Sequence, residues 1–294
     1  MTQEQIGKLF RIGGAAATVG VAACVHAAAK ELPLAQIMAV RAGISGVIIL
    51  AWGLVRAPAS LLPNRWGPHV VRGGLALVAM WLTYFAFARL DIAQAQTLTY
   101  IAPLLVLPIA MVRLGEAPSP RIILGLAMGF AGVLLILGLS TQAGPAAVWG
   151  ALAGIAGAVL IAIIQITVRQ MTATETTLSI AMSFTLIVAV VASLSALRGD
   201  WVWPTGPLVW VLLASGVFGA MNLLMFAESL ARAPASAVAP LDYTGLIWAL
   251  LVDWIIFAHA PGVWSIGGSA LITLAALIVV LAPRAPAPPR APSA

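Results

Sequence analysis

Charge is what this sequence has least of. Asp, Glu, Lys and Arg together make up 8% of its 294 residues, whereas 62% are hydrophobic. About a quarter of the residues of an ordinary soluble domain are charged, so a chain with this composition is unable to cover a surface that faces water. The sequence therefore predicts an integral membrane protein, whose solvent is lipid.

Cysteine and the common catalytic motifs are also scarce. Cys24 is the one cysteine, which excludes a disulfide within the chain. The sequence has no glycine-rich phosphate loop followed by Lys, no Cys/His spacing of a metal site and no Gly-x-Ser-x-Gly elbow. We therefore expect no cofactor, no metal ion and no catalytic residue, and we interpret the protein as a non-enzyme.

The basic residues outnumber the acidic ones, 15 to 9, but they stand singly between apolar runs. A nucleic-acid surface gathers its basic residues in a patch or stripe, so no nucleic-acid partner is expected. The basic ends of membrane helices explain the excess better.

Long apolar runs fill almost the whole chain. A bilayer core of about 30 Å needs about 20 apolar residues per helix, and the sequence predicts ten such spans. They lie at residues 10–29, 34–55, 70–88, 93–112, 121–138, 147–168, 177–197, 207–229, 235–257 and 263–282. A proline- and alanine-rich tail follows at 284–294, and its composition is typical of disorder.

The distribution of Lys and Arg predicts the orientation of these spans, because basic loops stay in the cytoplasm. With the N-terminus inside, the predicted outer loops hold Lys30, Arg89 and Arg198, and Arg41 lies within a span. The other Lys and Arg residues are then cytoplasmic, and so are both termini.

The chain also matches itself when it is shifted along its own sequence by one fixed offset. That offset pairs Arg89 with Arg232 and Tyr100 with Tyr243, and it pairs Gly125 with Gly268. It predicts two units of five helices, at residues 1–140 and 141–283. Because five is odd, the second unit enters the membrane from the opposite face, and inverted repeats of this kind are common in transporters.

At this point the sequence resembles a known family, the drug/metabolite transporter superfamily in its EamA-type branch. The segment 90–103 (LDIAQAQTLTYIAP) is similar to that family's fourth helix, and Glu116-Ala117-Pro118 is similar to the turn before its fifth. Arg41 resembles an arginine often found in the second helix. His259 departs from the pattern, since it stands where the repeat expects Glu.

The resemblance implies an all-α membrane protein of the bacterial inner membrane, with two inverted five-helix repeats around a central cavity. Helices one to four and six to nine would line that cavity, and helices five and ten would lie apart from it. Within the family, the chain is similar to the bacterial exporters of aromatic amino acids.

Polar and aromatic residues recur on single helix faces, and amides that face lipid are costly. We expect these side chains to line the cavity, where the aromatic rings would stack on a substrate. The alternative is ordinary packing and the aromatic belt of the membrane surface. The predicted set is Met80, Trp81, Tyr84, Gln96, Thr97, Tyr100, Gln165, Asn222, Phe226, Tyr243 and Trp248.

Three ionisable residues within the predicted spans are candidates for a role in transport, because charge is costly there. Asp242 would hold a substrate amine or a coupling proton, or else would lie near the cytoplasmic interface, paired with Arg232 or in contact with water in the cavity. Arg41 would bind a substrate carboxylate or hold helix ends together. His26 would relay protons or be a neutral, hydrogen-bonded histidine.

Prolines interrupt the two repeat-related helices, the fourth and the ninth. Pro103, Pro108 and Pro240 each remove a backbone donor, and each is a candidate hinge.

Together these features predict a secondary transporter that exports aromatic or other neutral amino acids, or related small metabolites, by alternating access. An exporter of drugs or toxic cations, and an intramembrane enzyme, are the alternatives. The expected partners are a small-molecule substrate and membrane lipid. We expect a monomer, although the sequence leaves a dimer open.

Overall fold

Helices make up the fold throughout the part of the chain that the structure describes. The computed structural model describes residues 1–87, 89, 98–137, 145–196, 201–255 and 262–281. The predicted boundary between residues 140 and 141 and the predicted tail at 284–294 lie outside these ranges. No strand occurs within them, as expected for a chain whose backbone polar groups must be satisfied within each segment.

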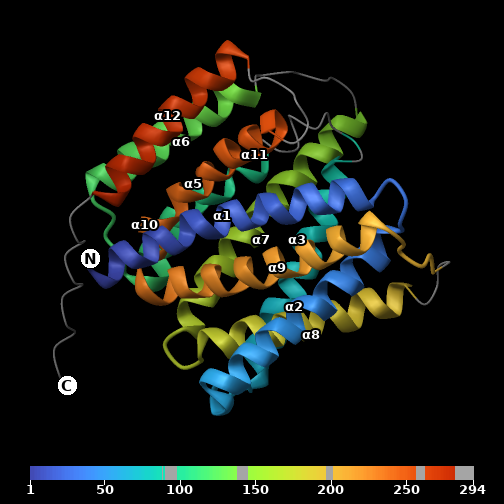
Figure 1. Cartoon of the computed structure of the whole chain (residues 1–294). Coiled ribbons are helices and arrows are strands. Elements are labelled where there is room, and N and C mark those ends of the chain that lie inside the picture. Colours follow the sequence, from blue (N-terminus) through green and yellow to red (C-terminus); the bar gives the residue numbers. More distant parts are fainter. Residues whose placement is uncertain (88, 90–97, 138–144, 197–200, 256–261, 282–294) are drawn as a thin grey trace, which may run out of the picture.

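The helices follow one another along the chain as shown in Figure 1. They are α1 (Gln3–Ala28), α2 (Leu34–Arg56), α3 (Trp66–Phe87), α5 (Ala102–Leu114), α6 (Pro120–Leu137), α7 (Pro145–Met171), α8 (Thr177–Ala196), α9 (Pro207–Arg232), α10 (Ala235–Val238), α11 (Thr244–Ile255) and α12 (Val263–Val280), with short 3₁₀ helices η1 (Pro58–Ser60) and η2 (Ala239–Tyr243). Ten membrane segments result, because α10, η2 and α11 form the predicted ninth span in three pieces.

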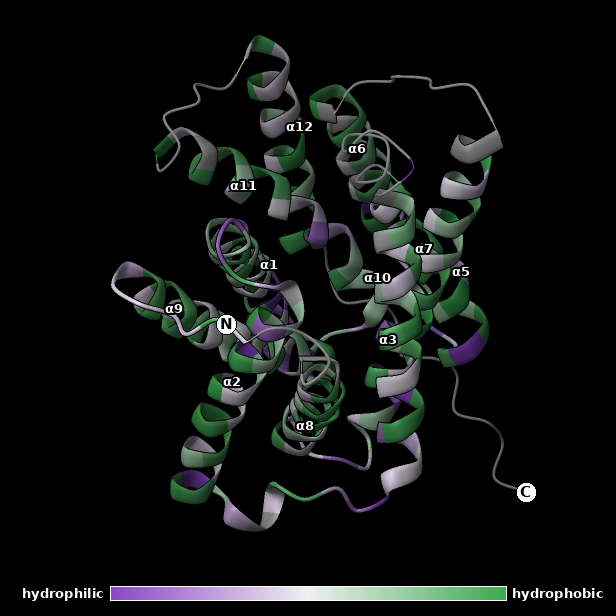
Figure 2. Cartoon of the chain, turned by 90° about the vertical axis from the view of Figure 1, so that its right-hand side faces the viewer, coloured by the Kyte–Doolittle hydropathy of each residue, from purple (hydrophilic) through white to green (hydrophobic). Residues whose placement is uncertain are grey.

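Most of these helices are suited to a bilayer by length and composition. Seven helices in the described ranges are long and apolar enough to cross a membrane, and α5 and α6 are shorter apolar helices. Hydrophobic residues predominate along the helices in Figure 2. The first span begins earlier than predicted, at Gln3, because the side chain of Thr2 and that of Gln5 form a capping box there.

Prolines shape the two central segments as the sequence suggests. Pro240 lies in η2, where the helix tightens to 3₁₀ geometry between α10 and α11. Pro108 lies inside α5, and Pro103 lies in its first turn, where a missing N–H costs least. The predicted role of these prolines as hinges stays a prediction.

Eight segments form a closed ring. Going round it, α1 contacts α9, followed by α2, α8, α3, α7 and α5, and η2 then closes the ring onto α1. The remaining two helices, α6 and α12, pack along each other at the edge of the molecule (Figure 1). The fifth and tenth spans therefore lie apart from the ring, as the family resemblance implied.

The α6–α12 contact reveals how the two halves are related. The backbone of Gly125 in α6 packs against Val279, and the backbone of Gly268 in α12 packs against Ile136. The repeat offset pairs Gly125 with Gly268 and Ile136 with Val279, so the two contacts exchange when the halves are exchanged. Reciprocal contacts of this kind are the mark of a two-fold axis.

The same relation holds inside the ring. Glycines in repeat-related helices pack against repeat-related partners, and the repeat offset again relates each contact to its counterpart. The matched contacts are Gly73–Ile187 with Gly216–Ile44, and Gly14–Met225 with Gly157–Leu82. Because each half has five helices, this pseudo-two-fold axis relates two inverted repeats.

We predict that Gly132→Ala lowers the unfolding temperature of the purified protein in detergent. A Cβ at this position would come within 2.8 Å of the backbone oxygen of Gly268, and such overpacking costs about 1–3 kcal/mol. The matched control is Gly74→Ala in α3, where a Cβ would meet nothing within 4 Å. Equal unfolding temperatures for the two variants would contradict this account of the α6–α12 contact.

Candidate functional site

An ion pair lies inside the ring, between helices of different halves. Arg11 of α1 donates from Nε to Asp242 Oδ1 at 2.5 Å and from Nη2 to Oδ2 at 2.7 Å. The Arg11 side chain is 4% exposed and that of Asp242 is 25% exposed. Bidentate geometry of this kind is what a charge pair needs in order to offset its removal from water.

The break in the ninth span sets the position of Asp242. This residue lies in η2, directly before α11, which begins at Thr244. The first turn of a helix leaves backbone N–H groups unbonded and attracts negative charge. A carboxylate at this break is therefore better placed than one in the middle of a regular helix.

Gln165 and Phe226 complete the surroundings of the pair. Gln165 Nε2 of α7 donates to Asp242 Oδ2 at 3.1 Å, and the Phe226 ring of α9 lies with its centroid 4.6 Å from Arg11 Cζ. Asp242 therefore reaches across the interior of the ring to α7, a helix that is not adjacent to η2 in the ring.

Two buried atoms of this cluster lack a hydrogen-bond partner among the described residues: Nη1 of Arg11 and Oε1 of Gln165. Buried polar groups are normally bonded, so such exceptions ask for an explanation. One is a donor on a cation and the other is an acceptor on an amide. The cluster can therefore offer hydrogen bonds of both kinds.

A second polar contact lies two helical turns along α1. Asn222 Nδ2 of α9 donates to Thr18 Oγ1 and lies 3.5 Å from the Gly14 carbonyl oxygen. Arg11 and Thr18 are seven residues apart and share one face of the helix. The polar groups of α1 thus continue along this face, beyond the ion pair.

The two repeat-related tyrosines meet where α5 and η2 pack together. The centroids of the Tyr100 and Tyr243 rings are 6.0 Å apart, and the Tyr100 hydroxyl lies against Gly245. Tyr243 is fully buried against the backbone of Gly129, and its hydroxyl has no partner among the described residues. The pair brings together two residues that the repeat singles out.

The structure describes only some of the predicted cavity residues on α3 and in the fourth span. The face of α3 that meets α7 at Gly157 carries Ala79 and Thr83, so Trp81 points to the other side of the helix. Trp81 is 64% exposed and stacks on Phe85. Met80 is half-buried. The Tyr84 side chain, Gln96 and Thr97 lie outside the described part of the chain.

Trp248 lies apart from the ion pair. It lines an apolar groove of about 280 Å³ between α1, α11 and α12, together with Leu9, Ile12 and Leu277. Because α12 stands outside the ring, this groove does too, and its lining suits contact with lipid.

Arg41 and His26 also lie away from the ion pair. Arg41 is half-buried and its guanidinium lies against Gly219 of α9. His26 is exposed in the last turn of α1. A basic side chain in the last turn suits the negative end of the helix.

Arg232 does not pair with Asp242. It forms an ion pair with Glu228, and its guanidinium stacks over the Phe10 ring. The alternative that paired Asp242 with Arg232 is therefore wrong, because Arg232 stands at the end of α9 whereas Asp242 turns inward from η2.

One end of the ring is tied shut by hydrogen bonds to backbone groups. Arg169 Nη1, near the end of α7, donates to the carbonyl oxygens of Leu230 at 2.6 Å and Ala231 at 3.3 Å. Glu116 accepts from the backbone N–H groups of Ala235 and Ser236 at the start of α10. The Arg169 bonds join α7 and α9 of the second half, and the Glu116 bonds join the first half to the second.

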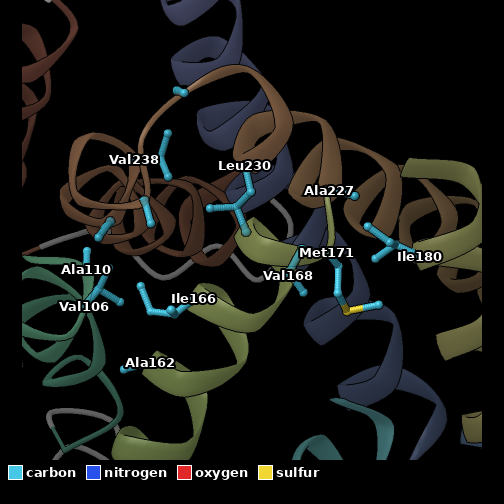
Figure 3. Close-up of a cluster of buried hydrophobic side chains, with 13 residues drawn as sticks. Val106, Ala110, Ala162, Ile166, Val168, Met171, Ile180, Ala227, Leu230 and Val238 are labelled. Carbon is cyan, nitrogen blue, oxygen red and sulfur yellow. The ribbon is translucent and has the colours of Figure 1, made fainter. Parts of the chain in front are cut away.

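An apolar cluster fills the same end. Figure 3 shows side chains from α5, α7, α8, α9 and α10 meeting there, among them Val106, Ile166, Leu230 and Val238. All four are buried. The ring is therefore closed at this end by packing as well as by polar contacts.

A buried carboxylate joins two loops near this end. Glu175, between α7 and α8, accepts from the backbone N–H groups of Asn64 at 2.9 Å and Arg65 at 3.0 Å. His69 of α3 lies beside it, with Nε2 at 3.6 Å. Burial raises the pKa of Glu175, but these hydrogen bonds and the charge of His69 outweigh burial and hold the pKa below its ordinary value of 4.5.

We predict that Glu175→Gln destabilises the protein at neutral pH by about 1–3 kcal/mol, because two N–H groups lose a charged acceptor. A lowered folded-state pKa gives stability that is present above pH 4.5 and is lost as the pH falls through the folded-state value. The difference in unfolding temperature from wild type should therefore shrink below about pH 4.5.

The control for this prediction is Glu31→Gln, which changes an exposed carboxylate in the loop after α1. It should leave the unfolding temperature unchanged. A Glu175→Gln difference that persists unchanged in acid would contradict the assignment of the effect to the charge of Glu175.

Arg11 is a residue that the sequence analysis does not single out, because it counts only among the basic residues of the cytoplasmic side. A signal was present. Gly7, Arg11, Gly14 and Thr18 recur at helical spacing on one face, and that face packs against α9. If these four residues form one surface, Arg11 points toward the interior of the ring together with them.

Comparison with known proteins identifies a matching protein family. The model of the EamA-like transporter family matches residues 5–138 and again residues 148–281. A crystal structure that is 24% identical superposes with a TM-score of 0.80, covering 92% of this chain and 95% of its own. That likeness concerns the fold.

Among curated proteins, the pseudopaline exporter of Pseudomonas aeruginosa is 26% identical over 87% of this chain and 89% of its own. A riboflavin transporter of Rhizobium johnstonii is 27% identical over 72% and 69%. An S-adenosylmethionine uptake transporter of Rickettsia felis is 23% identical over 80% and 79%.

Proposed function

The chain belongs to the EamA-like transporter family, and from this premise we propose that it is a secondary transporter that exports amino acids or related small metabolites by alternating access. Its relatives are named as transporters of several different organic solutes. The family therefore establishes a transporter of small molecules, and the choice of solute rests on the site.

The observation that carries the proposal is a two-fold-related ring with charged groups in its interior. Two halves with reciprocal contacts have two equivalent ways to pack, one closed at each end. Within the described residues, α7 also contacts α9 across the ring, whereas the repeat-related pair, α1 and α3, makes no contact of similar extent. This asymmetry supports a state closed at the end that holds Arg169.

The orientation of that end follows from the basic residues. Lys8, Arg11, Arg169 and Arg232 belong to it, and clusters of Lys and Arg favour the cytoplasm. We therefore assign the closed end and both termini to the cytoplasmic side of the bacterial inner membrane. The structure would then represent a state open to the outside.

An aromatic ring beside the ion pair supports an aromatic or other neutral amino acid. Phe226 lies over Arg11, whereas Tyr243 turns away from Asp242 and packs with Tyr100 against α6, outside the ring. Aromatic faces bind flat apolar groups, whereas charged groups hold the polar end of a solute. An aliphatic pocket with a single negative charge would instead favour a simple organic cation.

The orientation predicts a labelling pattern in whole cells. In a Cys24→Ala background, a membrane-impermeant maleimide should modify Glu31→Cys in intact cells, and Arg65→Cys only after the membrane is made permeable. Both positions are exposed, and they lie at opposite ends of α2. Modification of both cysteines in intact cells would refute the assigned topology.

We predict that Phe226→Ala lowers counterflow of labelled phenylalanine in proteoliposomes about three- to tenfold, because Phe226 lies at Arg11 and an aromatic contact contributes about 0.5–1.5 kcal/mol. The control is Trp203→Ala, an aromatic residue that is 79% exposed in the segment before α9, which should leave counterflow unchanged at equal protein content. Chemical conversion of the solute without flux would speak against transport altogether.

A further inference from the structure

The ion pair occurs at one end of a symmetric fold only. The repeat offset pairs Arg11 with Gly154 and Asp242 with Thr99. The segments that carry these uncharged residues still meet, since α5 packs on α7 and Gly154 of α7 lies against Leu98, the residue before Thr99. The fold therefore forms this type of contact without a charge pair.

The ion pair of Arg11 and Asp242 is also costly, because it lies in the interior of a membrane protein. Removing two charges from water takes several kcal/mol, and their attraction only partly offsets that loss. Since the repeat-related position has no ion pair, helix packing does not explain the presence of the pair. A role of the pair in binding a ligand explains it.

The hydrogen bonds that remain open define that ligand. Nη1 of Arg11 is a buried donor without a partner among the described residues, and Oε1 of Gln165 is a buried acceptor without one. The Arg11 side chain is 4% exposed, and Asp242 is 25% exposed and so accessible beside them. An anionic group fits the arginine, and a cationic N–H group fits the carboxylate and the amide oxygen.

We propose that Arg11, Asp242 and Gln165 bind the polar end of the transported solute, and that this end is a zwitterion with an anionic and an ammonium group close together. Nη1 of Arg11 donates to the anion, and Oδ2 of Asp242 and Oε1 of Gln165 accept from the ammonium. This inference rests on the proposed transport function and specifies the charges of its solute.

Charge balance distinguishes a zwitterion from the alternatives. It brings no net charge into an interior of low polarity, and it supplies a counter-ion to each member of the pair. A solute with a single charge brings a net charge into this interior, where one member of the pair attracts it and the other repels it. Because Arg11 and Asp242 come from different halves, the solute also bridges them.

The test uses three labelled probes that share one apolar part: phenylalanine, phenethylamine and phenylpropionate. Counterflow is measured in proteoliposomes that contain the full chain. For wild type we expect phenylalanine to be preferred over both singly charged probes by at least about tenfold, the loss typical of an unpaired buried charge.

Two single variants should change the preferred charge. Asp242→Asn leaves Arg11 unpaired and should favour phenylpropionate, whereas Arg11→Gln leaves Asp242 unpaired and should favour phenethylamine. The double variant has no charge at this site, as at the repeat-related position, and should fold while losing its preference for phenylalanine. Glu228→Gln, which alters the ion pair with Arg232 at the same end, is the control and should keep the wild-type order.

Three results would overturn the inference: equal loss of all probes in both single variants, wild-type preference in the double variant, or no flux of any probe in a protein that moves another metabolite. The last result would leave the proposed transport function intact. Absence of flux for every solute would instead refute transport itself.

Discussion

Lipid offers no hydrogen bonds, and this constraint governs the whole molecule. It requires each backbone segment in the bilayer to satisfy its own polar groups, which an α-helix does. It also turns polar side chains inward, because the cost of leaving them toward lipid exceeds the cost of ordering them inside. Arg11, Asp242 and Gln165 meet inside the ring, and Asn222 bonds to Thr18 in the same way. The outer helices α6 and α12 meet instead through glycine and apolar side chains.

The two halves are related in packing but not in chemistry. Glycine contacts such as Gly73–Ile187 and Gly216–Ile44 repeat with a fixed offset, so the helices of both halves approach one another in the same manner. The charges do not repeat, since Arg11 and Asp242 correspond to Gly154 and Thr99. The symmetric packing thus carries this ion pair at one end only.

The closed end combines apolar packing with hydrogen bonds to backbone groups. Apolar packing around Leu230 and Val238 joins five helices. Hydrogen bonds from Arg169 to the end of α9, and from the start of α10 to Glu116, fix the directions of these helix ends. The relatives named for riboflavin, S-adenosylmethionine and pseudopaline share the family. One family fold thus serves relatives that are named for different solutes.

Composition, the length of the apolar runs and the repeat determined that this chain forms ten membrane helices in two halves, because lipid selects helices and an odd number of helices inverts the second half. The site is different. Asp242 stood out in the sequence as a charge within a span, but its partner did not, since Arg11 lies 231 residues away and resembles any basic helix end. The contacts of Trp248 and Trp81 were equally hidden, because one helix face meets the ring and another meets lipid. Only the packing of α1 against α9 and η2 decided which side chains meet, since spacing fixes a face and tertiary contacts choose its neighbour.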